Sequence, residues 1–242
     1  MLDGRVAVVT GGSSGIGRAV TIALAAAGAT VVAVGRDTTR LQDVAAAGGP
    51  DDRIETTVLD LADDDAVRGL GAELAAAYGA IDVLVHAAGD IAFGRVEDAG
   101  IDDLDRLFGV NLRAPYLLTQ AILPLLGRPG GHIVFVNSSA GVRPSAGVAG
   151  YGAMKHALRG LADALRDEVN PLGIRVTSVY PGRTRTPMQA SVHRWEGRAE
   201  MSDELLEPED VAAMIVALLG LPGRAEVTDL HVRPAYPPRT GA

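Results

Sequence analysis

The sequence predicts an α/β protein with a doubly wound parallel sheet of about seven strands, in a single domain that spans residues 1–242. Short apolar runs rich in β-branched residues alternate with longer segments of helical period, a pattern typical of a parallel sheet covered on both faces. No internal repeat or break in composition marks a second domain. The 242 residues, of which 48% are hydrophobic, suffice for one sizeable core.

Each expected element follows from its own stretch of sequence. Seven apolar runs predict strands, namely Val6–Val9, Thr30–Val34, Ile54–Leu59, Val83–His86, His132–Val136, Ile174–Val179 and Val227–Val232. Helical spacing between these runs predicts helices at Ile16–Ala27, Thr39–Ala47, Asp63–Tyr78, Ile101–Leu126, Tyr151–Asn170 and Pro208–Leu219. The segment Arg183–Leu206 fits neither period. Because loops of that length often cover binding sites, we expect a substrate lid around residues 183–206.

The composition excludes several classes of function. The formal net charge is −8 and no stripe of lysine and arginine is present, so we expect no nucleic-acid partner. The chain has no cysteine, which excludes disulfides, thiolate catalysis and zinc–thiolate sites. The five histidines show no H-E-x-x-H or other metal-binding spacing, so no catalytic metal is expected.

The chain also lacks the signals of export and of membrane insertion. Its start, MLDGRVAVV, shows no charged segment followed by a long apolar one, as a signal peptide would. No apolar run reaches the roughly 18–20 residues that cross a bilayer. We therefore expect a soluble, cytoplasmic protein without a membrane partner.

A glycine-rich turn follows the first expected strand and leads directly into a helix. It reads T10-G-G-S-S-G-I-G17, in which Gly11, Gly15 and Gly17 give the pattern G-x-x-x-G-x-G. Glycines permit a tight turn and let the backbone approach a pyrophosphate at the positive helix N-terminus. No lysine follows the last glycine, so this is not a Walker A loop. The alternative is a loop that merely needs positive φ angles, but its position between strand and helix favours a nucleotide site.

A second motif, Y151-G-A-M-K155, places a phenol and an ammonium four residues apart. On a helix these side chains lie on one face and can meet the same small molecule. Taken alone, Tyr151 fits an ordinary core residue and Lys155 a solvated surface residue. The pair therefore gains meaning only from the motifs around it.

T-G-x-x-x-G-x-G near the N-terminus, with Y-x-x-x-K about 140 residues later, resembles the short-chain dehydrogenase/reductase family. The resemblance covers nearly the whole chain, because further family motifs follow in the expected order: D60-L61, H86-A-A-G89, N111, S138-S-A-G141 and P181-G182. It implies a Rossmann-like fold, a nicotinamide dinucleotide, and hydride transfer between that cofactor and a carbonyl or alcohol carbon.

The resemblance also implies site residues. The implied catalytic set is Asn111, Ser138, Tyr151 and Lys155; Ser138 is preferred to Ser139 because it lies thirteen residues before Tyr151. The implied cofactor-binding set is Gly11, Ser13, Ser14, Gly15, Ile16, Gly17, Arg36, Asp60, Leu61, Ala87, Ala88, Gly89, Tyr151, Lys155, Pro181, Gly182, Thr184 and Thr186.

Each catalytic role has a physical reason. A free tyrosine has a pKa near 10, and a nearby ammonium is expected to lower the Tyr151 pKa toward the working range. Lys155 can also bind the nicotinamide ribose, and the Ser138 hydroxyl can stabilise charge on the substrate oxygen. Asn111 resembles the residue whose backbone holds a water that links Lys155 to solvent. The alternatives are local ones, with Ser138 or Asn111 capping a turn or helix.

Several positions depart from the family pattern. His86 stands where the family has asparagine, and we expect it to be a structural substitute that hydrogen-bonds. Asp60 resembles the residue that contacts the adenine amino group, although it can instead cap the next turn. Thr184 replaces an aliphatic residue, which matters little if its contact is through the main chain. The C-terminal E226-V-T-D-L-H-V-R-P234 resembles tails of reductases for small hydroxy acids, but can equally just complete a strand and a subunit contact.

The end of the second strand, V31-V-A-V-G-R-D37, bears on the choice of dinucleotide. A carboxylate there binds the adenosine ribose and repels a 2′-phosphate, but Gly35 occupies that position. Arg36 follows, and its guanidinium can grip a 2′-phosphate. The Asp37 carboxylate can instead turn toward the adenosine ribose and restore recognition of NAD. Ser14 also lacks the positive charge that many relatives that use NADP carry at this position. We favour NADP(H) over NAD(H), the alternative being an Arg36 paired with a surface acid.

The leading hypothesis is an NADP(H)-dependent carbonyl reductase or alcohol dehydrogenase acting on a small molecule. The alternative from another class is a non-catalytic nucleotide-sensing protein of the same fold; epimerase or dehydratase chemistry is weaker, because those enzymes commonly carry an added domain. Candidate pocket residues are Phe93, Val142, Arg143, Met188, Val192, His193 and Trp195, of which Arg143 or His193 can pair with a substrate carboxylate. The resemblance also implies a homotetramer or homodimer that pairs the helices Ile101–Leu126 and Tyr151–Asn170, and both carry many small and apolar residues.

Overall fold

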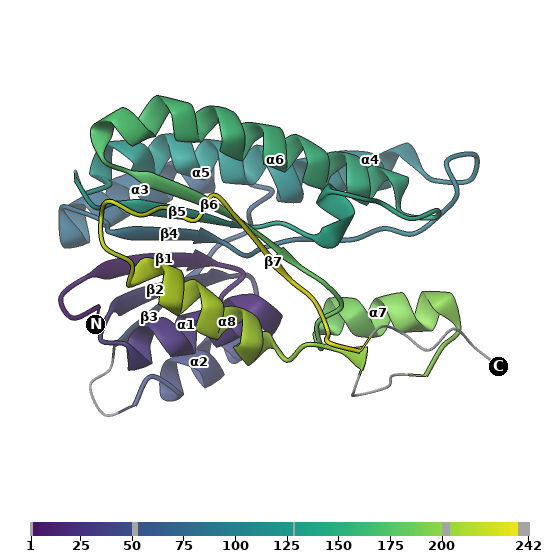
Figure 1. Cartoon of the computed structure of the whole chain (residues 1–242), viewed down its shortest axis with the longest axis horizontal. Coiled ribbons are helices and arrows are strands. Elements are labelled where there is room, and N and C mark those ends of the chain that lie inside the picture. The colour runs from purple at the N-terminus through teal and green to yellow at the C-terminus, as the bar shows by residue number, and fades with distance from the viewer. Residues whose placement is uncertain (1, 50–52, 128, 200–203, 237–242) are drawn as a thin grey trace.

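The computed structural model describes residues 2–49, 53–127, 129–199 and 204–236. Seven parallel strands form one sheet in the order β3-β2-β1-β4-β5-β6-β7 (Figure 1). They are β1 (Val6–Thr10), β2 (Thr30–Gly35), β3 (Ile54–Val58), β4 (Val83–His86), β5 (His132–Val136), β6 (Arg175–Pro181) and β7 (Asp229–Val232). Every expected strand is therefore present, with ends that differ by up to two residues.

Helices cover both faces of this sheet, so β4, β5 and β6 are buried along their whole length. One face packs against α1 (Gly15–Ala26), α2 (Thr38–Ala46) and α8 (Pro208–Leu219). The other face packs against α3 (Asp64–Tyr78), α5 (Ala114–Ile122) and α6 (Ala149–Val169) (Figure 1). The fold is thus the Rossmann-like α/β arrangement that the alternation of strands and helices predicts.

The strand order reverses between β1 and β4. From β1 the chain moves outward to β2 and β3, then returns to β4 and continues to the opposite edge at β7. In the shared register, Val8 of β1 lies opposite Val32 of β2 and Leu84 of β4. Loops diverge beyond the carboxyl ends of strands at such a reversal and leave room for a ligand there.

The expected single helix Ile101–Leu126 is wrong in one respect. The segment consists of α4 (Ile101–Phe108), a π-helical turn (Gly109–Arg113), α5 and a 3₁₀ turn (Leu123–Leu125). Pro115 has no N–H to donate to the carbonyl four residues earlier, and the Ala114 N–H bonds instead to Gly109, five residues back. Apolar periodicity does not reveal this insertion, because one wider turn barely changes the spacing of the apolar positions on either side of it.

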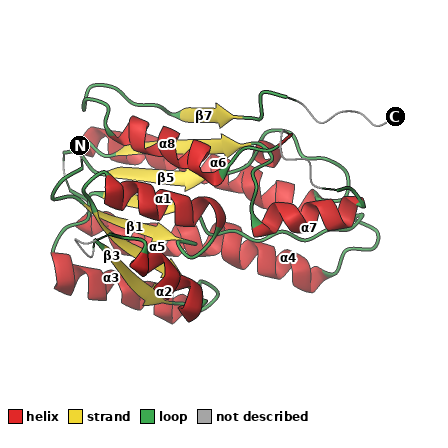
Figure 2. Cartoon of the chain, turned by 90° about the horizontal axis from the view of Figure 1, so that it is seen from below, coloured by secondary structure: helices red, strands yellow, loops and turns green. Residues whose placement is uncertain are grey.

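The prediction of an irregular segment at residues 183–206 is wrong in part, because the segment contains the helix α7 (Pro187–Glu196); residues 200–203 of the prediction lie outside the described residues. Thr186 caps this helix by accepting a hydrogen bond from the Gln189 N–H, and Pro187 starts it at a position that needs no donor. Figure 2 shows α7 beyond the ends of the strand arrows. The helix is short and half of its residues are polar. The apolar residues are therefore too few to show a helical pattern in the sequence.

Within the described part of the chain, no helix is both long enough and apolar enough to cross a membrane.

Candidate active site

A cleft of about 680 Å³ runs along the carboxyl ends of the strands, over the reversal between β1 and β4. All of the predicted cofactor-binding residues line it except Gly17, and so do Ser138, Tyr151 and Lys155. Asn111 lies behind the wall, fully buried. The fold thereby gathers residues from widely separated segments at one site.

The glycine-rich turn has the shape that a pyrophosphate needs. A Cβ added to Gly17 would stand 2.2 Å from the Gly11 carbonyl oxygen, and one added to Gly11 would stand 2.8 Å from the backbone of Ala88. Gly11 also has a φ of +68°, which disfavours any other residue. No side chain caps the start of α1, so its first N–H groups remain available to an anion. The turn therefore fits a dinucleotide pyrophosphate.

The polar residues at the β2 end of the cleft divide into two roles. Arg36 is exposed and lines the cleft. Asp37 instead caps α2, where its Oδ1 accepts from the Arg40 N–H at 3.1 Å and its Oδ2 lies 3.2 Å from Arg40 Nε. Asp60 lines the cleft while its Oδ1 accepts from the Ala62 N–H at 3.0 Å, so it also caps the following turn. Arg36 is thus the charged side chain that β2 contributes to the cleft.

Tyr151 and Ser138 meet at the centre of the cleft. Tyr151, in the first turn of α6, is 7% exposed and shares a hydrogen bond with Ser138, which stands directly after β5. Burial raises the Tyr151 pKa above its usual value, and the Ser138 hydrogen bond opposes that rise. The sequence led us to expect a lowered pKa caused by Lys155. In this structure the phenol is instead held in its protonated form, which suits a proton donor.

Lys155 lies one helical turn further along α6, with its Nζ 5.9 Å from the centroid of the Tyr151 ring. The residue is 3% exposed, and its ammonium donates to the Val136 carbonyl at 3.0 Å. Burial lowers the Lys155 pKa from 10.5 to about 8. The side chain therefore reaches from α6 to β5. Its ammonium group can lose a proton at about pH 8.

Asn111 occupies the π-helical turn, and its side chain is held by the backbone of Asp90. Its Nδ2 donates to the Asp90 carbonyl at 2.9 Å, and its Oδ1 accepts from the Asp90 N–H at 3.0 Å. A Cβ added at Gly89 would lie 3.2 Å from Asn111 Oδ1 and 3.7 Å from Lys155 Nζ, which places all three together. The pair of hydrogen bonds fixes the loop after β4 beside Lys155.

His86, which stands at the end of β4 where the family has asparagine, is buried within the sheet. Its Nε2 lies 2.9 Å from Thr119 Oγ1 on α5, and its ring stacks on Phe135 with centroids 4.9 Å apart. Burial, and then the charge of Lys155, lower the His86 pKa to about 3, so the imidazole is neutral around pH 7. It does not line the cleft, and it bonds sheet to helix from behind the site.

Asn137 is a residue that the sequence analysis missed. Only 3% exposed, it accepts from the Ser138 N–H at 2.9 Å and donates to the main-chain carbonyl of Lys155 at 3.1 Å. One side chain therefore ties the backbones of two predicted catalytic residues together. A polar residue ending the apolar run of β5, next to Ser138, is the signal that could have identified it.

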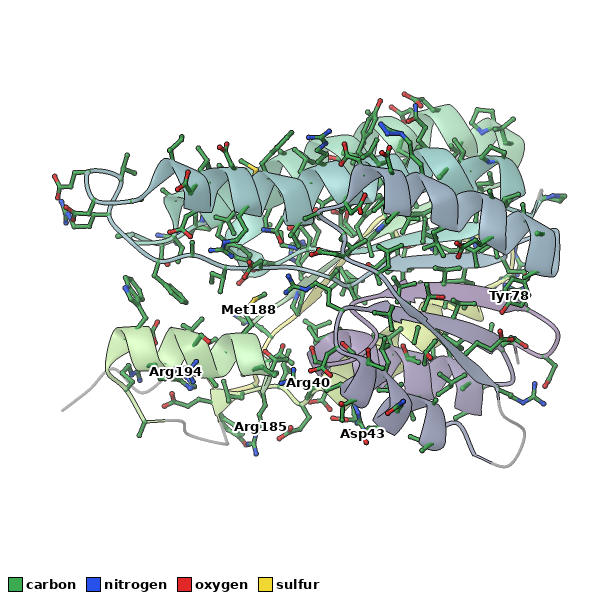
Figure 3. All side chains as sticks on the ribbon, turned by 180° about the vertical axis from the view of Figure 1, so that it is seen from behind. Arg40, Asp43, Tyr78, Arg185, Met188 and Arg194 are labelled. Carbon is green, nitrogen blue, oxygen red and sulfur yellow. The ribbon has the colours of Figure 1, made fainter. Side chains whose placement is uncertain are left out.

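The predicted substrate-pocket residues fall into two groups. Phe93, Met188, Val192 and Trp195 line the cleft, and the Met188 side chain points from α7 toward the rest of the domain (Figure 3). Val142, Arg143 and His193 do not line it. Val142 and Arg143 are exposed, whereas His193 is buried with its Nε2 3.1 Å from Gln189 Nε2. The expected partners for a substrate carboxylate are therefore absent from the lining, because the loop and α7 turn them away.

Two further threonines close the β6 end of the cleft. Thr184 is 5% exposed and donates from Oγ1 to the Gly182 carbonyl at 3.1 Å, while Thr186 caps α7. Both hydroxyls bond to nearby backbone groups, so a ligand contact by these residues would be made through their main chain. Among the described residues, no group of three or more His, Asp or Glu side chains is arranged to hold a metal ion.

Comparison with known proteins gives one consistent result. The model of the family described as short chain dehydrogenase matches residues 5–197. A relative from Sinorhizobium fredii strain NGR234, named as a short-chain type dehydrogenase/reductase, is 37% identical over 235 residues, which cover 95% of this chain and 91% of the relative.

Solved structures agree with this result. A short chain dehydrogenase from Burkholderia cenocepacia J2315, in complex with NADP, is 37% identical with a TM-score of 0.87, covering 96% of this chain and 97% of that one. An alcohol dehydrogenase from the archaeon Thermococcus sibiricus, complexed with 5-hydroxy-NADP, is 28% identical with a TM-score of 0.87 and the same coverage.

Proposed function

The chain belongs to the short-chain dehydrogenase family, and from that premise we propose that it transfers a hydride between NADP(H) and a carbonyl compound or the matching secondary alcohol. The observation that carries the proposal is the meeting of Ser138, Tyr151 and Lys155 in one cleft with a phosphate-binding turn. Two similar structures are complexed with NADP or its 5-hydroxy derivative, which supports a nicotinamide cofactor.

The residues of the cleft suit this chemistry. The turn from Gly11 to Gly17 would hold the pyrophosphate, and Lys155 would bind the nicotinamide ribose. The bound cofactor supplies or accepts the hydride. Ser138 donates a hydrogen bond to the substrate oxygen, and Tyr151 passes its phenolic proton to that oxygen during reduction, or receives it during oxidation. The described part of the predicted lid, residues 183–199 and 204–206 with α7 (Pro187–Glu196), would cover this site.

The direct test is to mix the purified protein with NADPH and a panel of aldehydes and ketones, and to follow NADPH absorbance. We expect substrate-dependent loss of absorbance. A protein that binds NADPH tightly but oxidises it with no member of the panel would instead be a nucleotide sensor of this fold.

We propose that Arg36 makes the protein prefer NADPH to NADH. Asp37 caps the start of α2, so the carboxylate that would favour NADH faces Arg40. Replacing Arg36 with alanine should lower kcat/KM for NADPH by roughly 10- to 100-fold and leave that for NADH nearly unchanged. Steady-state kinetics with both cofactors measure this. Arg18→Ala, an arginine of α1 that does not line the cleft, is the control; a wild-type preference for NADH would contradict the assignment.

We propose that the protein is a homo-oligomer, a tetramer or a dimer, that pairs α4–α5 and α6 with their copies across two-fold axes. The α4–α5 segment carries apolar side chains beyond those that face the sheet, namely Leu104, Phe108 and Tyr116, which are 38%, 43% and 53% exposed. On α6 the exposed face carries small residues such as Ala157 and Ala164. Light scattering at micromolar concentration should give a mass of two or four chains. A single-chain mass of 24.9 kDa at that concentration would overturn the proposal.

A further inference from the structure

The cleft wall beside the Tyr151 hydroxyl is apolar. Ile91, Phe93, Ala140 and Val148 line the cleft, and the same side chains pack in one hydrophobic cluster with Tyr151. A substituent on the reacting carbon would therefore lie against hydrocarbon, and burying an apolar substituent there is favourable.

An aromatic pair closes the mouth of this end of the cleft. The rings of Phe93 and Trp195 stack with centroids 5.2 Å apart and planes inclined by 14°. Trp195 also lies over Gly147, where an added Cβ would come within 2.3 Å of the indole. The indole thus joins α7 to the loop after β4 and to the loop before α6. Trp195 is still 47% exposed, so part of its side chain remains accessible to a ligand or solvent.

The cationic side chains that line the cleft are each placed or bonded so that they are not offered to an anionic substrate. Arg36, Lys155 and Arg183 are the cationic side chains among the described residues that line the cleft. Arg36 is exposed beside the end of β2, and Lys155 is buried and bonded to the Val136 carbonyl.

The third cation, Arg183, makes a bidentate pair with Glu196 of α7, at 2.8 and 2.5 Å. Three acids also line the cleft, Asp60, Asp90 and Glu196, so a carboxylate brought there would meet further negative charge. Burying an ion without a partner is costly, so this end of the cleft disfavours anionic substrates.

From these three observations we propose that the substrate is a neutral carbonyl compound, or its alcohol, that carries an aryl or alicyclic group, and that Phe93 and Trp195 determine this choice by packing against that group. This inference rests on the proposed function and names its substrate class. It departs from two separate sequence-based interpretations, the C-terminal tail that resembles those of reductases for small hydroxy acids and the pairing of a substrate carboxylate with Arg143 or His193.

The kinetic test uses two ketones that differ in one group, cyclohexyl methyl ketone and cyclohexylglyoxylate, in which a carboxylate replaces the methyl. With NADPH, we expect kcat/KM to be about 100-fold lower for the keto acid. Trp195→Ala and Phe93→Ala should each raise KM for the neutral ketone about 10-fold and leave the KM for NADPH unchanged. The matched control is Val142→Ala, which shortens an exposed apolar side chain outside the cleft.

A binding test that needs no turnover uses Trp195, because it is the only tryptophan of the chain. The oxidised cofactor, NADP⁺, cannot reduce a ketone, so the protein loaded with it forms a stable ternary complex. Adding cyclohexyl methyl ketone should change the Trp195 emission in a saturable manner, whereas cyclohexylglyoxylate at the same concentrations should not.

The outcomes separate the two proposals. Preference for the keto acid, unchanged KM in both alanine variants, or an emission that does not respond to the neutral ketone would overturn the substrate class while hydride transfer stands. Loss of hydride transfer would show as NADPH that is oxidised by neither compound and by no other carbonyl. The emission titration would then still decide whether this end of the cleft binds neutral apolar ligands.

Discussion

Replacing Tyr151 with phenylalanine should lower kcat by about 10³-fold while the fold and the affinity for NADPH are retained. The phenyl ring fills the same place in the cluster around Leu107 and Val148, so packing is preserved. The change removes the hydroxyl, its proton and its hydrogen bond with Ser138. Stopped-flow and steady-state measurements of NADPH oxidation test the rate, and fluorescence titration with NADPH tests binding.

The control for this change is Tyr116→Phe, which makes the same substitution at an exposed tyrosine of α5. It should leave kcat unaltered. If Tyr151→Phe reduces carbonyls at nearly the wild-type rate, then Tyr151 is not the proton donor. Because burial raises the Tyr151 pKa, the phenol stays protonated through neutral pH, and reduction by the wild type should not decline as pH rises from 6 to 8 through loss of that proton.

Replacing Lys155 with methionine should abolish turnover and at the same time make the cofactor-free protein more stable. Burial lowers the Lys155 pKa from 10.5 to about 8, a shift equivalent to roughly 3 kcal/mol of unfavourable desolvation at neutral pH. Methionine has a similar length and no charge to desolvate. It loses the hydrogen bond to the Val136 carbonyl, which offsets about 1 kcal/mol of the gain.

The pH dependence gives this prediction a definite sign. Between pH 8 and 10.5 the unfolded chain keeps the Lys155 proton and the folded chain has lost it, so wild-type stability rises with pH across that window. The advantage of Lys155→Met should therefore be full below pH 8 and fade toward pH 10.5. Urea unfolding of the wild type and of Lys155→Met at about pH 7 and pH 10 measures this advantage. If the two proteins differ in free energy of unfolding by the same amount at both pH values, the desolvation argument is contradicted.

The Lys155 pKa can also be measured directly, because this is the only lysine of the chain. Protein labelled with carbon-13 lysine should show one side-chain resonance, and its titration midpoint should lie near pH 8. A midpoint above pH 10 would mean that water reaches the ammonium, and the stability gain of Lys155→Met would then be absent.

The sequence by itself determined the sheet, its strands and the phosphate-binding turn. The strands follow from continuous apolar runs such as Val6–Val9, which need burial on both sides whatever surrounds them. The turn follows from local backbone sterics, because Gly11 has a positive φ and a Cβ at Gly17 would clash with the Gly11 carbonyl. The spacing of Tyr151 and Lys155 on one helix face is likewise a local property, and the structure brings both to the cleft with Ser138.

The tertiary structure decided what depends on segments that are distant in the sequence. Whether Arg143 and His193 lined the cleft, and where Trp195 lay, depended on how α7 and the loops pack together, which periodicity does not encode. The Tyr151 pKa was expected to fall because Lys155 is near in sequence, yet it rises because residues from other segments exclude water from the phenol. Desolvation depends on the total packing around a group, and this is why the local pattern located the reactive pair without giving its protonation state.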